Sequence, residues 1–368
     1  MIVIEMKRTK TNSRDSMFYI FRKNGSLRTA GCGQKLLLLF LILFAFSDNS
    51  FAQIAIKRNT VLMGSRFDIT IVAEDTLTAN QHIDEVIGEI KRIEELISDW
   101  KPASQVSEVN RNAGIQPVKV DREVFDLAKR AIYFSEITDG AFDISFAAMD
   151  KIWKFDGSMD TLPDAETIQK AIAKIGYQNI LLDSTSFTIF LKLPGMKIGF
   201  GATGKGYAAD RGRELMLSKG VKAGIVNASG DMAVWGNQPD GSPWKVGVTN
   251  PFKLHKVMEV LLLKSGAVTT SGDYQKYIEI DNVRYSHIIN PKTGMPATGL
   301  ASVTVIGPNA EMANGFSTSI MVLGQKEGLL LLEKYPDYAC LIITNSGKII
   351  KSKNWKVVKK LSKGKACR

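Results

Sequence analysis

The chain has 368 residues, 45% hydrophobic and 23% charged, a composition typical of one large globular body or two smaller ones. Its net charge of +11 lies mostly at the two ends: residues 1–52 carry +5 and residues 351–368 carry +8, which leaves −2 for residues 53–350. A nearly neutral body excludes a basic face for nucleic acid, and the three scattered cysteines exclude a disulfide framework or a cysteine-based metal cluster.

The first segment has the pattern of an export signal. Basic residues in 22–35 precede an apolar run at 36–46, which is shorter than the ~20 residues of a membrane-spanning helix. The small-x-small sequence S-F-A at 50–52 fits a cleavage site. We predict that residues 1–52 are a signal peptide or an N-terminal anchor. The protein is then exported, either periplasmic or attached to the outer face of the inner membrane.

The body, residues 53–350, opens with alternating and helical patterns in turn. Met63 lies between two predicted strands, where a core methionine is the simple interpretation. Trp100 follows a helix with a clear 3.6-residue apolar stripe and offers a flat surface on which a ring can stack. We predict strands at 55–63 and 67–73, helices at 78–98 and 121–138, and a polar segment with turn character at 104–112.

Ala141 and Phe142 begin a short apolar stretch that contains an acid, Asp143. An acid in an apolar stretch is costly to bury unless it is paired or bound to a ligand. Two interpretations stay open: Asp143 caps the helix that follows, or it contacts a ligand. Beyond it we predict a helix at 165–175 and a strand pair at 179–182 and 187–193.

A glycine-rich loop, G-F-G-A-T-G-K-G at 199–206, leads into a predicted helix at 206–219. The start of a helix presents backbone N–H groups and a positive dipole end to an anion, and Lys205 adds a full charge. The spacing is shorter than that of the nucleotide-binding G-x-x-x-x-G-K-[ST] loop. An ordinary strand–helix turn is therefore an equally good interpretation.

The second half reads as strands, one hairpin and a long helical region. Alternating runs at 274–280 and 283–289 predict a hairpin that brings the hydroxyls of 269–271, Asp273 and His287 towards one another. Asn314 and Thr318 are four residues apart, so they share one helical face and can offer two oxygens to a hard cation. Further strands are predicted at 223–227, 232–235, 245–249, 256–263, 301–307, 338–344 and 348–351, and helices at 309–324 and 325–334. The chain ends in a basic tail at 351–368, which is either solvated or in contact with a membrane surface.

Taken together, these segments resemble the ApbE family, the FAD:protein FMN transferases. The resemblance runs from Val61 to Gly324, with the motifs in family order. They are M-G-S-R-F at 63–67, S-D-W-K-P at 98–102 with S-E-V-N at 107–110, D-G-A-F-D-I-S at 139–145, G-A-T-G-K-G-Y-A-A-D at 201–210, V-N-A-S-G-D at 226–231, T-S-G-D-Y at 270–274, H-I-I-N-P-K-T-G-M-P at 287–296 and A-N-G-F-S-T-S at 313–319.

The resemblance implies an α+β fold, ApbE-like (T-fold-like), with mixed, largely antiparallel sheets and packed helices. It implies that FAD is the substrate, that Mg²⁺ neutralises its pyrophosphate, and that FMN passes to a Thr or Ser hydroxyl of an acceptor flavoprotein while AMP leaves. Carried over by position, the FAD contacts are Met63, Trp100, Ala141, Phe142, Asp143, Lys205 and Ile288, the metal ligands are Ala202, Asn314 and Thr318, and the proton acceptor is His287 or, as a second candidate, Asp273.

Three positions depart from the family pattern. Asn314 stands where the family has a metal-binding Asp, Asn290 stands where H-I-I-D-P has an acid, and Gly199 stands at a position that is often acidic. An amide oxygen ligates Mg²⁺ but brings no charge, so weaker metal binding is expected. Two alternatives to the transferase therefore stay open: an FAD pyrophosphatase that yields FMN and AMP, and a non-catalytic extracytoplasmic flavin-binding protein.

Overall fold

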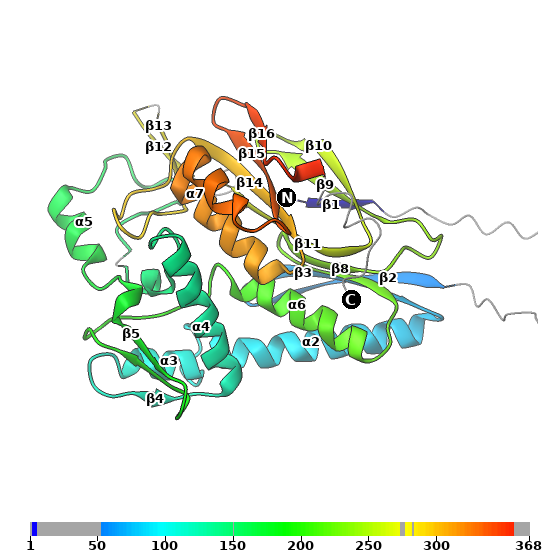
Figure 1. Ribbon diagram of the computed structural model, residues 1–368, viewed down its shortest axis with the longest axis horizontal. Helices are drawn as coiled ribbons and strands as arrows, with labels where there is room; N and C mark the ends of the chain where they lie inside the picture. The colour runs from blue at the N-terminus through cyan, green and yellow to red at the C-terminus, as the bar shows by residue number, and fades with distance from the viewer. Residues whose placement is uncertain (1, 6–52, 150, 273–276, 282, 357–368) are drawn as a thin grey trace, which may run out of the picture.

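The centre of the molecule is an antiparallel sheet of eight strands, seen in the computed structural model of Figure 1. The structure describes residues 2–5, 53–149, 151–272, 277–281 and 283–356. The strand order is β16-β15-β14-β11-β8-β7-β3-β2, and every neighbouring pair is antiparallel. In that order the strands are Ile349–Lys351, Ala339–Thr344, Leu300–Gly307, Ser265–Gly272, Asp231–Trp235, Ala223–Ala228, Ser65–Ala73 and Ile54–Leu62.

Three helices cover one face of this sheet: α2 (Thr76–Ile97), α6 (Gly204–Ser218) and α7 (Ala310–Glu333) (Figure 1). The apolar stripe of α2 is fully buried against the sheet, as its 3.6-residue period predicts. Helices α6 and α7 touch at their first turns, where a Cβ on Gly206 would lie 2.6 Å from the carbonyl oxygen of Ala310. This contact needs glycine, and it sets the two helix starts side by side beneath the candidate site.

The opposite face of the sheet packs on β9 (Trp244–Asn250) and β10 (Lys253–Leu263). Trp244 is fully buried in this second, wholly apolar core, and Trp355 packs into the same core. Strand β1 (Ile2–Glu5) pairs with β9, so part of the segment predicted as a leader lies in this small sheet. Cleavage after residue 52 would remove it.

A side lobe carries the remaining elements. The polar segment 104–112 is a helix, α3, rather than the predicted turn-like segment, because Ser104 accepts the backbone N–H of Ser107 and caps it. Asp143 caps the short helix η1. The lobe comprises α3 (Gln105–Arg111), β4 (Val118–Lys119), α4 (Arg122–Ile137), η1 (Ile144–Ala148), α5 (Ala165–Ile172), η2 (Tyr177–Asn179), β5 (Ile180–Asp183) and β6 (Thr188–Leu191).

The predicted hairpin is present as β12 (Tyr277–Ile280) and β13 (Val283–Ser286), which pair antiparallel. Its strands are shorter than predicted, since His287 already lies beyond β13, and residues 273–276 and 282 are outside the described residues. The hydroxyl cluster at 269–271 is not part of the hairpin. It lies on β11, inside the main sheet, because that stretch bonds to β14.

These elements confirm the predicted fold class, an α+β fold with largely antiparallel sheets. Helix α7 contains a break at Gly324, whose φ of 77° and ψ of −179° separate the two helices expected there. The folded body also extends past residue 350, since Trp355 is only 2% exposed and donates its indole N–H to Glu259. No helix within the described ranges is long and apolar enough to cross a membrane.

Candidate active site

A cavity of about 540 Å³ lies where the starts of α6 and α7 meet the side lobe. Its walls come from seven separate segments of the chain. They are the end of α2 (Asp99 and Trp100), the η1 region (141–144, 146 and 147), the loop and start of α6 (199, 201, 202 and 205), the turn between β7 and β8 (229–231), the end of β11 (270–272), the segment after β13 (287–289 and 291) and one face of α7 (Asn314, Thr318 and Val322).

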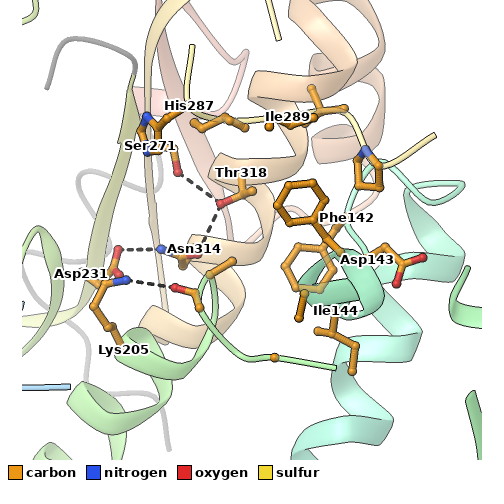
Figure 2. A pocket seen from close by; sticks show the side chains of 18 of the residues that line it. Phe142, Asp143, Ile144, Lys205, Asp231, Ser271, His287, Ile289, Asn314 and Thr318 are labelled. Atoms are coloured by element: carbon orange, nitrogen blue, oxygen red, sulfur yellow. Dashed lines mark hydrogen bonds between the residues drawn. The ribbon is translucent and has the colours of Figure 1, made fainter. Parts of the chain in front are cut away.

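The floor of the cavity is a chain of polar side chains (Figure 2). Asn314 donates from Nδ2 to Asp231 Oδ1 at 2.8 Å, and its Oδ1 lies 3.4 Å from Thr318 Oγ1. Ser271 Oγ lies 3.3 Å from Thr318 Oγ1 and 2.8 Å from Ser317 Oγ. The predicted pairing of Asn314 and Thr318 on one helical face is therefore present, and both side chains border the cavity.

Lys205 enters this floor from the first turn of α6. Its ammonium donates to the carbonyl oxygen of Gly201 at 3.0 Å, and Figure 2 shows it beside Asp231. Burial raises the pKa of Asp231 to about 6, although the positive charge of Lys205 and the hydrogen bond from Asn314 oppose the rise. The predicted glycine loop thus places a cation and a helix N-terminus at the cavity, the arrangement that binds phosphate.

His287 and Ile288 border the cavity on the side of the β12–β13 hairpin. The imidazole is exposed and lies edge-on to Phe155, with ring centroids 6.4 Å apart. Ile288 is fixed by its backbone: its N–H donates to the hydroxyl oxygen of Ser286 at 3.0 Å, and its carbonyl oxygen accepts the N–H of Ala297 at 2.7 Å. Asp273, the second candidate for proton acceptor, lies outside the described residues.

The opposite wall is largely apolar. Ala141 and Phe142 line it, and Trp100 stands at its rim with 76% of its surface exposed. The ammonium of Lys151 lies 4.7 Å from the Trp100 ring centroid, so the ring already holds a cation on one side. Met63 is not among the lining residues; it packs on the main core, with its terminal methyl 3.7 Å from the Cβ position of Gly204.

Asp143 lines the cavity, but its carboxylate is occupied by the protein. One oxygen accepts the backbone N–H of Ser145 at 2.8 Å and its hydroxyl at 2.6 Å, and the other accepts the N–H of Tyr177 at 2.8 Å. In Figure 2 the side chain points away from Asn314 and Lys205. Burial raises the pKa of Asp143 above its ordinary value. Of the two interpretations left open by the sequence, the structure shows the capping one; contact with a ligand stays a prediction.

Two cavity carboxylates were not predicted as site residues, Asp99 and Asp231. Desolvation of its carboxylate raises the pKa of Asp99, and a Cβ on Gly199 would lie 3.2 Å from its Oδ2. A carboxylate therefore does stand beside Gly199, supplied by another segment. Asp231 follows a turn with positive φ at Ser229 and Gly230, of 53° and 108°. In the sequence, the motif V-N-A-S-G-D indicates this turn, because glycine readily adopts a positive φ, and Asp231 is the residue that follows it.

The oxygen donors fit a hard divalent cation. The amide oxygen of Asn314, the hydroxyl of Thr318, the carboxylate of Asp231 and the backbone at Ala202 all border one cavity. The described residues contain no group of three or more His, Cys, Asp or Glu side chains that would form a complete protein cage. Mg²⁺ suits this set, since it is usually held by one or two protein oxygens together with substrate phosphates and water.

A helix N-terminus with a lysine, a row of side-chain oxygens and an apolar wall together fit the class of site that binds a nucleotide with a charged diphosphate. Comparisons with known proteins agree with this class. The ApbE family model matches residues 63–342. An FAD:protein FMN transferase of Klebsiella pneumoniae is 32% identical over 80% of this chain and 90% of its own length.

Solved structures give the same result. The ApbE protein of Thermotoga maritima is 33% identical, with a TM-score of 0.75 over 83% of this chain and 99% of its own. The flavin transferase ApbE of Vibrio cholerae is 25% identical, with a TM-score of 0.73 over the same shares. The chain belongs to the ApbE family of enzymes.

Proposed function

We propose that this protein transfers FMN from FAD to a Thr or Ser hydroxyl of an acceptor flavoprotein, with release of AMP. The observation that carries the proposal is the shared cavity, which brings Lys205, the Asn314–Thr318 pair and His287 to one place in a chain of this family. The relatives that match over most of their length bear the name FAD:protein FMN transferase.

The step requires an oriented hydroxyl, a base and a neutralised pyrophosphate. The acceptor oxygen bonds to the FMN-side phosphorus, and the bond from that phosphorus to the bridging oxygen breaks. The bridging oxygen leaves with its electron pair as part of AMP. His287, exposed at the cavity edge, takes the proton of the acceptor hydroxyl, because an imidazole can accept a proton at neutral pH.

The remaining polar groups hold the pyrophosphate. Lys205 and the first turn of α6 would meet its negative oxygens, while Asn314, Thr318 and the carbonyl of Ala202 would hold Mg²⁺. When bound, the cation withdraws charge from the phosphorus that is attacked. Phe142 and Trp100 cover the rings of the dinucleotide, and Ser271 closes the wall beside Thr318.

We further propose that the protein works outside the cytoplasm, as its leader pattern indicates, on an acceptor that belongs to a redox complex. The basic residues at 357–368, outside the described residues, would add contact with an anionic membrane surface. Fractionation of cells that express the full chain tests this: the exported fraction should hold the protein. A variant without residues 1–52 should stay in the cytoplasm.

The decisive test of the reaction is a mass measurement. Protein, FAD, Mg²⁺ and a flavoprotein acceptor domain are mixed, and the acceptor is weighed before and after. We expect the acceptor to gain one FMN and AMP to appear in equal amount. FMN and AMP in solution with an unmodified acceptor would instead show a pyrophosphatase. Bound but intact FAD would show a non-catalytic flavin-binding protein.

A further inference from the structure

The cavity floor has a charge arrangement that the metal ligands named above do not explain. Asn314 and Thr318 are neutral, yet they sit beside a carboxylate that is only 4% exposed. Three carboxylates line the cavity within the described residues. Asp143 is occupied in capping and Asp99 lies next to Gly199, whereas Asp231 is bonded directly to Asn314.

We propose that Asp231 supplies the negative charge of the cation site and also orients the amide of Asn314 towards the cation. This inference rests on the proposed function, because the cation concerned is the one that neutralises the FAD pyrophosphate. It assigns Asp231 as a positioning and charge-bearing residue, distinct from the base that accepts the proton.

The orientation follows from the chemistry of the two side chains. An ionised carboxylate only accepts hydrogen bonds, whereas an amide has a donor end and an acceptor end. The amide NH₂ must therefore face Asp231, at 2.8 Å, and the amide oxygen is turned to the side of Thr318. Without the carboxylate, nothing in that contact would distinguish the two ends of Asn314.

The charge balance leads to the same conclusion. A buried carboxylate is costly unless a compensating charge is near, and here the ammonium of Lys205 lies beside Asp231 (Figure 2). Lys205 and Asp231 cancel one another before any ligand binds. A divalent cation and a pyrophosphate diester are also opposite and equal in charge, so the site is balanced when both are present. Removal of the carboxylate would leave an excess positive charge.

This balance predicts two effects of opposite sign in one variant. Asp231→Asn keeps the shape of the side chain and an acceptor oxygen, but it removes the charge. Cation binding should weaken, while the anionic dinucleotide alone, now facing an uncompensated lysine, should bind as well as before or better. A residue with a purely structural role would weaken both when it is replaced.

The test measures FAD affinity by flavin fluorescence on the full chain, without any acceptor protein, in EDTA and again in saturating Mg²⁺. The ratio of the two dissociation constants is the coupling between FAD and Mg²⁺. We expect Asp231→Asn to reduce this ratio about tenfold or more, a loss of about 1.4 kcal/mol of coupling. FAD affinity in EDTA should be unchanged or increased. The double variant Asp231→Asn with Asn314→Asp, which moves the carboxylate to the neighbouring side chain, should recover most of the coupling.

Asp210→Asn is the matched control. Asp210 is also buried, with a pKa that burial raises to about 6, but it accepts the backbone N–H groups of Ala310 and Glu311 and does not line the cavity. Because Asp210 acts only through the backbone at the start of α7, its replacement should weaken FAD binding in EDTA and in Mg²⁺ alike and leave their ratio unchanged.

Three results would overturn the proposal. They are an absence of coupling in the unmodified protein, an unchanged coupling in Asp231→Asn, and a parallel loss of FAD affinity in EDTA in that variant. If Asp231→Asn fails to fold, the double variant still decides: its coupling should approach that of the unmodified protein because the carboxylate has moved to residue 314, and a coupling reduced about tenfold would overturn the proposal. Failure of FMN transfer in the mass test would not change any of these binding ratios, so the two proposals fail separately.

Discussion

The two ends of the cavity are built differently. At the polar end, Asp231, Asn314, Thr318 and Ser271 bond to one another at distances between 2.8 and 3.4 Å, and they come from the main sheet and α7. At the apolar end, Trp100 stands 76% exposed at the rim of the side lobe. The polar end is fixed before any ligand arrives, whereas the apolar end still has surface to bury.

The scaffold under the polar end explains its rigidity. Asp210 on α6 accepts two backbone N–H groups at the start of α7, at 2.7 and 2.9 Å, and also pairs with Arg213 at 3.1 Å. Helices α6 and α7 are thereby held start to start, which fixes Lys205 relative to Asn314. Groups held in this way stabilise a transition state without first being ordered. We therefore expect changes at the polar end to affect the reaction rate, and changes at the apolar end to affect FAD binding.

The largest effect is expected for His287→Ala. Loss of a general base typically reduces a rate about 10²- to 10⁴-fold, so single-turnover FMN transfer at saturating FAD should fall by that amount. FAD affinity should change little, because the imidazole is exposed at the cavity edge. His82→Ala is the control, since His82 pairs with Glu85 on α2 at 3.0 Å and is not a lining residue. A normal transfer rate in His287→Ala would assign the proton acceptor elsewhere, with Asp273 the next candidate.

A smaller effect, on FAD affinity and not on the transfer rate, is expected for Trp100→Ala. Stacking of a ring on an aromatic side chain contributes about 1–3 kcal/mol, so the dissociation constant of FAD should rise roughly tenfold while transfer at saturating FAD stays near normal. Trp100→Phe should be intermediate. Phe252→Ala removes another exposed ring, with 47% of its surface accessible, from a position that does not line the cavity and should change neither quantity. A rate defect at saturation would show that the two ends do not act separately.

Features that depend on short local motifs could be predicted from the sequence, whereas contacts between distant segments could not. Lys205, His287 and the Asn314–Thr318 pair all line the cavity, and each belongs to a short motif with its own local geometry. The bond between Asp231 and Asn314 joins residues 83 apart in the chain. It depends on the strand order that brings β8 beside the start of α7, and no periodicity in the sequence encodes that order.

The incorrect predictions have a similar origin. Residues 104–112 were interpreted as turn-like because their polar composition hides a capped helix. Thr270 and Ser271 do line the same cavity as His287, as expected, but the sequence did not indicate that their strand pairs with β14, more than 30 residues away in the chain. The strands and long helices were predicted from alternation and the 3.6-residue period, which are local properties. Tertiary pairing decided the rest.

The smallest functional effect is expected for Asp143→Ala, in the cavity wall that also carries Ala141 and Phe142. Its carboxylate holds Ser145 and Tyr177, so its loss should lower the free energy of unfolding by ~1–3 kcal/mol. FAD affinity should fall less than in Trp100→Ala, because the bonds that are lost are internal to the protein. Chemical denaturation and flavin fluorescence measure the two quantities. A loss of FAD affinity as large as that of Trp100→Ala, with normal stability, would make Asp143 a ligand contact instead.

The pH dependence of that stability difference sharpens the prediction. Burial raises the pKa of Asp143 above its ordinary value of 3.8, so the folded protein holds this proton more tightly than the unfolded chain does. The stability that the carboxyl group contributes is therefore greatest below pH 3.8 and falls as the pH rises towards the folded pKa. The difference in free energy of unfolding between the unmodified protein and Asp143→Ala should decrease between pH 3.8 and the folded pKa of Asp143, and stay constant at higher pH. Asp75→Ala is the comparison. Hydrogen bonds from Thr78 lower the pKa of this exposed capping carboxylate. The difference in free energy of unfolding between the unmodified protein and Asp75→Ala should therefore increase as the pH rises from the lowered pKa to 3.8.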